Sequence, residues 1–148
     1  MAELYSDHVE LYDIAFDWDV GEEVDWLVDR LCAPTVLEPG CGSGRMLEAL
    51  AQRGIEVFGI DRSDAMVAFA RRRLGRSDPV VVADMTDFDL GRKFAGAIGP
   101  INTLLHLRPE ELTRHLESMG RHLELGGRYL VQVGLVKPDQ RSRGRRLG

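Results

Sequence analysis

A glycine-rich segment, PGCGSG at positions 39–44, follows Glu38 at the end of a short apolar run. Glycines at 40, 42 and 44 let the backbone approach a ligand closely, because glycine has no Cβ atom to collide with it. A helical pattern begins directly afterwards, and the free N–H groups at a helix N-terminus favour an electron-rich ligand group. By itself this spacing is a weak indication of a cofactor loop. It is not a dinucleotide fingerprint, because Arg45 stands where that pattern requires glycine.

Two carboxylates follow the next two apolar runs. Asp61 comes after the run at 55–60, and Asp84 comes after the run at 80–83 and precedes Met85. A carboxylate such as Asp61 can accept hydrogen bonds from both hydroxyls of a ribose. Asp84 can accept one from an adenine amino group while a methionine packs on the ring. Taken singly, Asp61 is equally explained as a helix N-terminal charge and Asp84 as a turn residue. Together with the glycine-rich segment, they predict a nucleoside site.

The elements that would position these residues alternate between strands and helices. Strands are expected at 35–38, 55–60, 80–83, 94–98 and 128–136, and helices at about 21–32, 45–53, 64–74 and 109–125. This alternation predicts an α/β fold with an open, doubly wound, mostly parallel sheet. In such sheets ligands bind beyond the carboxyl ends of the strands, where the strand order reverses. The polar sites described above all fall at strand ends of this kind.

The last predicted helix and strand have distinctive patterns. The helix is expected to bury Leu112, Leu116, Met119 and Leu123 and to stop at Gly126 and Gly127. Two histidines on it, His115 and His122, are expected at the surface. The run at 128–136 is nearly continuous in apolar residues, which is typical of a strand covered on both faces.

Composition excludes several classes of protein. The chain has 148 residues, 44% of them hydrophobic and 29% charged, which predicts one globular domain. It has no membrane-length apolar run and no signal-peptide core, so we expect a cytoplasmic protein. Two cysteines and four histidines show no metal-ligand spacing, and we expect no metal site.

The net charge of −5 is unevenly distributed. Residues 1–30 carry ten acids and one base, whereas residues 137–148 carry five bases. A basic end can bind nucleic acid, but few aromatic residues stand among these arginines to stack on bases. A solvated terminus is therefore the favoured interpretation.

Four successive segments resemble the motifs of class I S-adenosylmethionine-dependent methyltransferases, in order and at that family's spacing. They are VLEPGCGSGRMLEAL, FGIDRSDAMVAFARRR, VVADMTDFDL, and INTLLHL followed by LELGGRYLVQV, which together cover about residues 35–136. The resemblance implies a Rossmann-like sheet of roughly seven strands that binds S-adenosylmethionine. It also implies methyl transfer to an acceptor, here expected to be a small molecule. The sequence GPIN at 99–102 replaces an Asn-Pro-Pro-Tyr type of signature, so nucleic acid is not the expected acceptor.

The resemblance also implies which residues hold the cofactor: Glu38, Gly40, Cys41, Gly42, Gly44, Asp61, Arg62, Met66, Asp84, Met85, Gly99 and Pro100. Glu38 would help to hold the amino end of the methionine group, Asp61 the ribose hydroxyls, and Asp84 with Met85 the adenine edge. Cys41 is expected to be a small residue in a crowded turn and not a nucleophile.

The remaining roles implied by the resemblance are positional. Arg62 and Met66 would flank the adenine. Gly99, Pro100 and Asn102 would lie beside the methionine group and the transferred methyl.

Catalytic and acceptor residues are expected on either side of the cofactor. His106 is the best-placed candidate base, with a packed helical turn carrying a half-exposed histidine as the alternative. Tyr5, Tyr12, Phe16 and Trp18 are expected to form an aromatic lid over the cofactor and acceptor, with ordinary packing of an amphipathic helix against the sheet as the alternative. Asn102 is also expected to contact the acceptor. Acids around the aromatic residues suit a cationic or amine acceptor, although a solvated helix face explains them equally well.

The chain is expected to comprise an N-terminal helical lid (1–34), a cofactor-binding core (35–136) and a basic tail (137–148). The family core continues past the fifth strand, for which the tail is too short, so the sheet is expected to be truncated after strand 5 with the order 3-2-1-4-5. The run at 128–136 would then be an exposed edge, which predicts a homodimer that covers it. Two alternatives are a non-catalytic S-adenosylmethionine-binding or assembly protein and, disfavoured by Arg45, an NAD(P)-dependent oxidoreductase.

Overall fold

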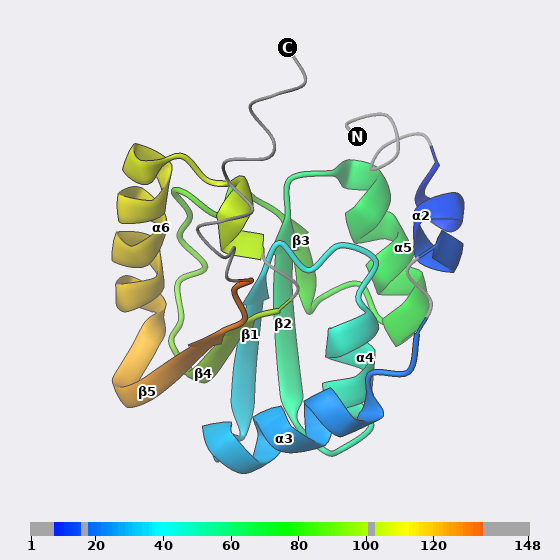
Figure 1. Cartoon of the computed structure of the whole chain (residues 1–148), viewed down its shortest axis with the longest axis horizontal. Helices are drawn as coiled ribbons and strands as arrows, with labels where there is room; N and C mark the ends of the chain where they lie inside the picture. The colour runs from blue at the N-terminus through cyan, green and yellow to red at the C-terminus, as the bar shows by residue number, and fades with distance from the viewer. Residues whose placement is uncertain (1–7, 16–17, 101–102, 135–148) are drawn as a thin grey trace, which may run out of the picture.

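The computed structural model describes residues 8–15, 18–100 and 103–134. Its elements in chain order are α2 (Val9–Ala15), α3 (Gly21–Leu31), β1 (Thr35–Pro39), α4 (Arg45–Ala51), β2 (Glu56–Asp61), α5 (Asp64–Leu74), β3 (Val80–Val82), β4 (Phe94–Gly99), the 3₁₀ turn η1 (Thr103–His106), α6 (Pro109–His122) and β5 (Leu123–Val131) (Figure 1). Tyr5, Phe16 and Asn102 lie outside the described residues, as does the side chain of Tyr12.

The sheet has the order β3-β2-β1-β4-β5, and each pair of neighbouring strands is parallel. This confirms the predicted order 3-2-1-4-5. The chain builds outward from β1 to β3 and then returns to add β4 on the other side of β1. The strand order therefore reverses between β1 and β4, where open α/β sheets bind their ligands.

Successive residues of the strands face two separate cores, as the two-residue period of a strand requires. Val36 of β1 belongs to a cluster with residues of α3, α4 and α5. The next residue, Leu37, belongs to a second cluster with Phe88 and with Met119 of α6. Helices α3, α4 and α5 therefore cover one face of the sheet, and α6 with the loop after β3 covers the other.

Local sequence signals explain where α5 begins and ends. The Ser63 hydroxyl accepts the Met66 amide hydrogen at 3.3 Å and caps the helix N-terminus. Gly75 follows the last helical residue with a φ of +68°, a left-handed conformation that glycine adopts without strain. Both expectations about this helix are confirmed.

The boundary between α6 and β5 differs from the expected one. The helix ends at His122, and β5 begins at once with Leu123 and continues through Gly126 and Gly127, which were expected to separate the two elements. Leu123 already pairs with Phe94, and the strand pairing shifts between Phe94 and Gly96. The two glycines therefore lie within the strand, where its pairing with β4 is irregular, and they do not end the helix.

The buried face of α6 also differs from the expected one. Met119 is buried, but Leu116 is 49% exposed. The two histidines expected at the surface, His115 and His122, are 0% and 2% exposed. The polar residues lie inward because this face of α6 contacts the backbone of the loop after β3, where hydrogen-bonding side chains find partners.

Strand β5 is the edge strand of the sheet. Of the strand expected at 128–136, Arg128 and Val131 are exposed, whereas Tyr129 and Leu130 are half-buried against the two opposite cores, so the expected covering on both faces is only partial for 128–131. Leu125 is fully exposed, and Val131 is 36% exposed. None of the helices in the described part of the chain is both long and apolar enough to cross a membrane.

Candidate functional site

The glycine-rich loop connects β1 to α4 at the reversal point of the sheet. Gly40, Gly42 and Gly44 have φ values of +65°, +55° and +85°, which favour glycine at all three positions. A Cβ atom at Gly44 would lie 3.2 Å from Cα of Ala70, so the loop is closely packed against α5. At Gly42, in contrast, a Cβ atom would meet nothing within 4 Å. The loop thus leaves open space beside Gly42, where a ligand can approach the backbone.

Asp61, at the end of β2, holds this loop in place. Its carboxylate accepts the Gly42 amide hydrogen at 3.0 Å and the Ser63 amide hydrogen at 2.9 Å, one on each oxygen. The two bonds fix the plane of the carboxylate, and each oxygen keeps a further lone pair for a ligand hydroxyl.

Glu38, at the end of β1, is a buried carboxyl. It is 4% exposed, and its Oε1 atom has no hydrogen-bond partner within the described residues. Burial, and then the nearby Asp61 carboxylate, raises the pKa of Glu38 well above its ordinary value. A buried oxygen without a partner is costly, and a cationic ligand group would satisfy it.

Cys41 is buried beside these two carboxylates. Burial, and then the charges of Glu38 and Asp61, raises the pKa of the Cys41 thiol well above its ordinary value. The thiol form is a poor nucleophile. Gly59 on β2 faces Cys41 so closely that a Cβ atom there would lie 2.8 Å from the sulfur atom.

Asp84 follows β3 and is exposed. Its Oδ1 accepts both the amide hydrogen and the hydroxyl hydrogen of Thr86, each at 2.8 Å. The amide bond lowers the pKa of Asp84, and the nearby cations of Arg62 and Arg114 lower it further. Asp84 therefore presents an ionised carboxylate at the carboxyl end of the sheet, on the same side as Asp61.

Met85 and Met66, the two methionines of the predicted site, have different environments. Met85 is half-buried, and its carbonyl oxygen accepts a hydrogen bond from Nδ1 of His115 at 2.7 Å. Met66, on α5, is 1% exposed. Its side chain therefore presents almost no accessible surface to a ligand in this conformation.

The end of β4 forms the other wall of the site. Gly99 and Pro100 are both buried. The carbonyl oxygen of Pro100 accepts the Thr103 hydroxyl hydrogen at 2.6 Å, which sets the start of η1. Thr103 in turn approaches Gly40 closely: a Cβ atom added at Gly40 would lie 3.0 Å from the methyl carbon of Thr103. The segment after β4 is thus packed directly on the glycine-rich loop.

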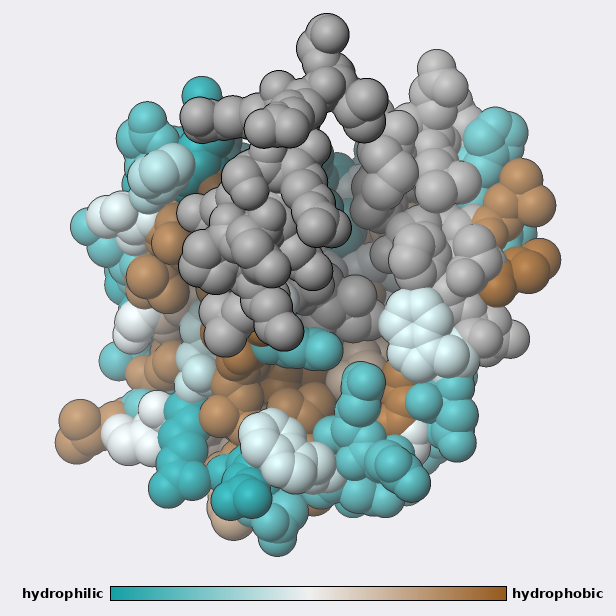
Figure 2. Space-filling model, viewed as in Figure 1, coloured by the Kyte–Doolittle hydropathy of each residue, from teal (hydrophilic) through white to brown (hydrophobic). Residues whose placement is uncertain are grey.

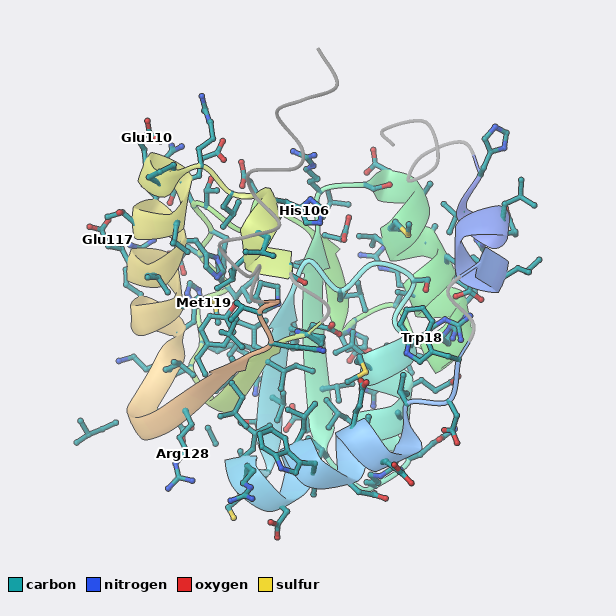
Figure 3. All side chains as sticks on the ribbon, viewed as in Figure 1. Trp18, His106, Glu110, Glu117, Met119 and Arg128 are labelled. Carbon is teal, nitrogen blue, oxygen red and sulfur yellow. The ribbon has the colours of Figure 1, made fainter. Side chains whose placement is uncertain are left out.

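The structure separates the predicted catalytic and lid residues. His106 lies at the end of η1, is exposed, and stands at the carboxyl end of the sheet (Figure 3). Trp18 lies beside α4 and α5, well away from His106 (Figure 3). It lines a small hollow with Glu48, Gln52 and other polar residues of that side.

Sequence reasoning missed a charged cluster that joins α2 to the glycine-rich loop. Asp13 accepts the Ser43 hydroxyl hydrogen at 2.8 Å and pairs with Arg45 at 3.1 Å and with Arg73 at 2.6 Å. These partners are 30 to 60 residues from Asp13 in the chain. No local pattern marks such a pairing, since only the spacing of charges within one helix is readable from sequence.

A second hollow lies between α3 and the end of β5. It has a volume of ≈ 600 Å³ and is lined by Glu22, Glu23, Trp26, Leu27, Met46, Ile98, Pro100, Leu130, Val131, Gln132 and Val133. Figure 2 shows its apolar surface bordered by hydrophilic residues. Among the residues that the structure covers, no three or more His, Cys, Asp or Glu side chains gather into a potential metal site.

Comparison with known proteins places this geometry in a family. The model of the family described as "Methyltransferase domain" matches residues 36–127. The chain therefore belongs to this family, and its fold is that of the class I S-adenosylmethionine-dependent methyltransferases.

Two curated relatives are sugar N,N-dimethyltransferases. One, from Saccharopolyspora spinosa, acts on dTDP-4-amino-2,3,4,6-tetradeoxy-D-glucose and is 37% identical over 100 residues, 62% of this chain and 40% of its own. The other, from Streptomyces venezuelae, acts on dTDP-3-amino-3,4,6-trideoxy-alpha-D-glucopyranose and is 30% identical over 130 residues, 77% of this chain and 54% of its own. The chain thus spans about half the length of these relatives.

Solved structures of similar proteins have the same fold. DesVI from Streptomyces venezuelae superposes with a TM-score of 0.78 at 30% identity, covering 89% of this chain and 59% of DesVI. CalS10 is an amino pentose methyltransferase from Micromonospora echinaspora, solved with S-adenosylmethionine bound. It superposes with a TM-score of 0.77 at 28% identity, covering 87% of this chain and 58% of CalS10.

The residues present fit S-adenosylmethionine as the cofactor. The buried, unpartnered oxygen of Glu38 suits the cofactor's positively charged end. The open space at Gly42 suits close passage of a ligand along the loop. The ionised Asp84 suits a hydrogen-bond donor such as an amino group.

Proposed function

We propose that this protein transfers a methyl group from S-adenosylmethionine to an amine nitrogen of a small-molecule acceptor. The observation that carries the proposal is the convergence of Glu38, Asp61 and Asp84 at the carboxyl ends of three neighbouring parallel strands. The relatives that methylate amino sugars support the amine acceptor. The working unit is then a core at 35–136 with an N-terminal lid at 1–34.

The proposed cofactor contacts follow the order of the strands. Glu38 would neutralise the ammonium group of the methionine end, and Asp61 would accept from the ribose hydroxyls. Asp84 would accept from the adenine amino group, with the Met85 side chain against the ring. Arg62 is exposed and close enough to lower the pKa of Asp84, which suits its proposed place beside the adenine.

The loop and the wall opposite it complete the cofactor site. Gly40, Cys41, Gly42 and Gly44 would line the cofactor's path, and Gly99 with Pro100 would lie beside the methionine group. Met66 would have to move for contact with the adenine, because its side chain is buried. We therefore propose that Met66 shapes the wall that α5 provides to the site, without touching the adenine in this conformation.

When bound, the cofactor supplies a methyl group that its sulfonium already activates. The protein must hold the acceptor nitrogen behind the methyl group. In favourable cases such positioning lowers the free-energy barrier by about 7–11 kcal/mol. A base is needed only if the nitrogen arrives protonated. His106 is exposed at the carboxyl end of the sheet, so it could take that proton from an acceptor and pass it to water.

The acceptor would occupy the hollow between α3 and β5. Pro100 lines this hollow and is also proposed to lie beside the methionine group, which supports an acceptor site next to the transferred methyl. Glu22 and Glu23 stand at the N-terminal end of α3 on its rim, where their charge attracts a cationic amine. We keep Tyr5, Tyr12 and Asn102 as proposed acceptor contacts. Trp18 is supported only as part of the lid, because it lies beside α4 and α5.

Further predictions from the sequence stay as proposals. We propose a cytoplasmic enzyme that does not act on nucleic acid, and a homodimer that covers the exposed edge of β5. Binding of S-adenosylmethionine without methyl transfer is the second candidate function. It is favoured by the exposure of the edge strand β5, whose exposed Val131 also lines the proposed acceptor hollow.

One pair of measurements tests the proposal. Calorimetric titration with S-adenosylhomocysteine should show saturable binding, and tritium from methyl-labelled S-adenosylmethionine should then be transferred to amino sugars in preference to their hydroxyl analogues. Binding without transfer to any amine would favour the second candidate. Preference for the hydroxyl analogues would contradict the amine acceptor.

A further inference from the structure

The buried face of α6 makes hydrogen bonds to the loop that follows β3. His115 bonds to the carbonyl oxygen of Met85 at 2.7 Å, and the Ser118 hydroxyl donates to the carbonyl oxygen of Thr86 at 3.3 Å. Both side chains are at most 1% exposed. A helix on the far side of the sheet from the glycine-rich loop thus holds the backbone of the loop that carries Asp84.

The partners of His115 determine its tautomer. The Met85 carbonyl oxygen can only accept, so Nδ1 must carry the hydrogen. Nε2 is then an acceptor, and it lies 2.9 Å from the hydroxyl of Tyr129 on β5, which must donate to it. Burial lowers the pKa of His115, which keeps the imidazole neutral. It also raises the pKa of Tyr129 far above its ordinary value, which keeps the donor hydroxyl intact.

The peptide group between Met85 and Thr86 is held at both of its ends. Its carbonyl oxygen accepts from His115, and its N–H donates to Oδ1 of Asp84 at 2.8 Å. Three hydrogen bonds therefore run in one direction, from Tyr129 to His115, from His115 to the peptide, and from the peptide to Asp84. Bonds aligned in this way polarise one another, so each link strengthens the next.

We propose that His115 and Tyr129 are positioning residues that fix the carboxylate of Asp84 for recognition of the cofactor's adenine amino group. The inference rests on the proposed function, in which the Asp84 carboxylate recognises this amino group. His115 orients the peptide, the peptide N–H orients the carboxylate, and Tyr129 fixes the imidazole. The edge strand β5 is thereby connected to the adenine end of the site.

The test compares two ligands that differ only at the adenine edge. S-Adenosylhomocysteine carries the 6-amino group, and S-inosylhomocysteine carries an oxygen in its place. The ratio of their dissociation constants, measured by calorimetry, reports how well Asp84 reads the amino group. A general loss of stability weakens the binding of both ligands together and leaves the ratio of their dissociation constants unchanged.

Two variants interrupt the chain of hydrogen bonds at different points, and a third restores a donor at one of them. Tyr129→Phe removes only the donor hydroxyl, and His115→Leu removes the bond to the peptide. Each should lower the preference for the adenosyl ligand by about three- to tenfold, the effect of losing one hydrogen bond. His115→Asn places an amide donor near the former Nδ1 and should recover most of the preference lost in His115→Leu.

A second buried histidine of α6 provides the matched control. His122 donates from Nδ1 to the Ser118 carbonyl oxygen at 2.6 Å and accepts the Leu90 amide hydrogen at 3.0 Å, away from Asp84. His122→Asn should lower the melting temperature while leaving the ligand ratio within about twofold of the parent.

The outcomes are distinguishable. If the parent protein binds neither ligand, the proposed function fails, and this inference fails with it. If the parent prefers the adenosyl ligand and Tyr129→Phe and His115→Leu retain that preference in full, only the positioning role is overturned. Should His115→Leu fail to fold, the ratio in Tyr129→Phe alone decides the matter.

Discussion

Asp13 of α2 and Ser43 of the glycine-rich loop are joined by a hydrogen bond of 2.8 Å, and the same carboxylate pairs with Arg45 and Arg73. The Asp13 side chain is only 15% exposed, so these bonds are largely shielded from water. The N-terminal helix is therefore attached directly to the loop that we propose holds the cofactor.

We expect Asp13→Asn to destabilise both the attachment of α2 and the loop. The variant removes the charge that pairs with two largely buried guanidinium groups, which should lower the free energy of unfolding by about 1–3 kcal/mol. It should also weaken S-adenosylhomocysteine binding. Chemical denaturation and calorimetry measure the two effects. Asp25→Asn, which breaks an exposed pair with Arg53, is the control and should change neither quantity appreciably. Equal effects in both variants would contradict the role of Asp13.

Glu38→Gln should make the unliganded protein more stable at neutral pH. The pKa of Glu38 is raised in the folded state, so the stability linked to its proton is present below about pH 4 and is lost as the pH rises through the folded-state pKa. Glutamine is neutral throughout, so the variant avoids that loss. Its advantage in melting temperature should grow from about pH 4 upward.

The same variant should bind S-adenosylmethionine less tightly, because it lacks the charge that would neutralise the cofactor's ammonium group. Glu117→Gln, which removes an equal charge from an exposed position on α6, serves as the control (Figure 3). A Glu38→Gln protein that is less stable at neutral pH and still binds with full affinity would count against our account of this residue.

Gly42→Ala should separate the conformational role of the loop from its role in binding. The φ of +55° makes any side chain there cost about 1–2 kcal/mol, although a Cβ atom meets no protein atom within 4 Å. Gly75→Ala is closely matched, since φ is +68°, the surrounding space is equally open and the position is at the end of α5. Both variants should lose similar stability in denaturation experiments. Only Gly42→Ala should lose affinity for S-adenosylhomocysteine, and equal affinities would mean that no ligand passes beside Gly42.

Light scattering at micromolar concentration tests the proposed homodimer. A charge at the exposed edge, as in Val131→Lys, should shift the protein to the monomer if a second copy covers β5. Leu11→Lys introduces the same charge at an exposed position of α2 and should leave the dimer intact. A parent protein that is monomeric throughout this range would refute the proposal.

The parallel sheet and the strand-end carboxylates could be predicted from sequence because each depends on a local signal. Gly75 and Ser63, for example, mark the ends of α5 by their own conformational preferences. The role of α6 could not be predicted in this way. Helical periodicity locates a buried face by its apolar residues, whereas His115 is buried because it meets the backbone of Met85, 30 residues away in the chain.

Asp13 illustrates the same limit. Its many acidic neighbours in the sequence favour a solvated helix face, and only the folded chain brings Arg73 to it. Residues whose partners are backbone groups or distant charges are thus the ones that sequence patterns miss at this site.

The most direct test of the account is a calorimetric titration of the folded protein with S-adenosylhomocysteine, repeated with Asp61→Ala. The account predicts one saturable site in the parent and a loss of about 1–3 kcal/mol in binding free energy in the variant, because ribose hydroxyls lose their acceptor. An absence of binding to the folded parent, or equal affinity in the folded variant, would contradict a nucleoside site at the ends of these strands.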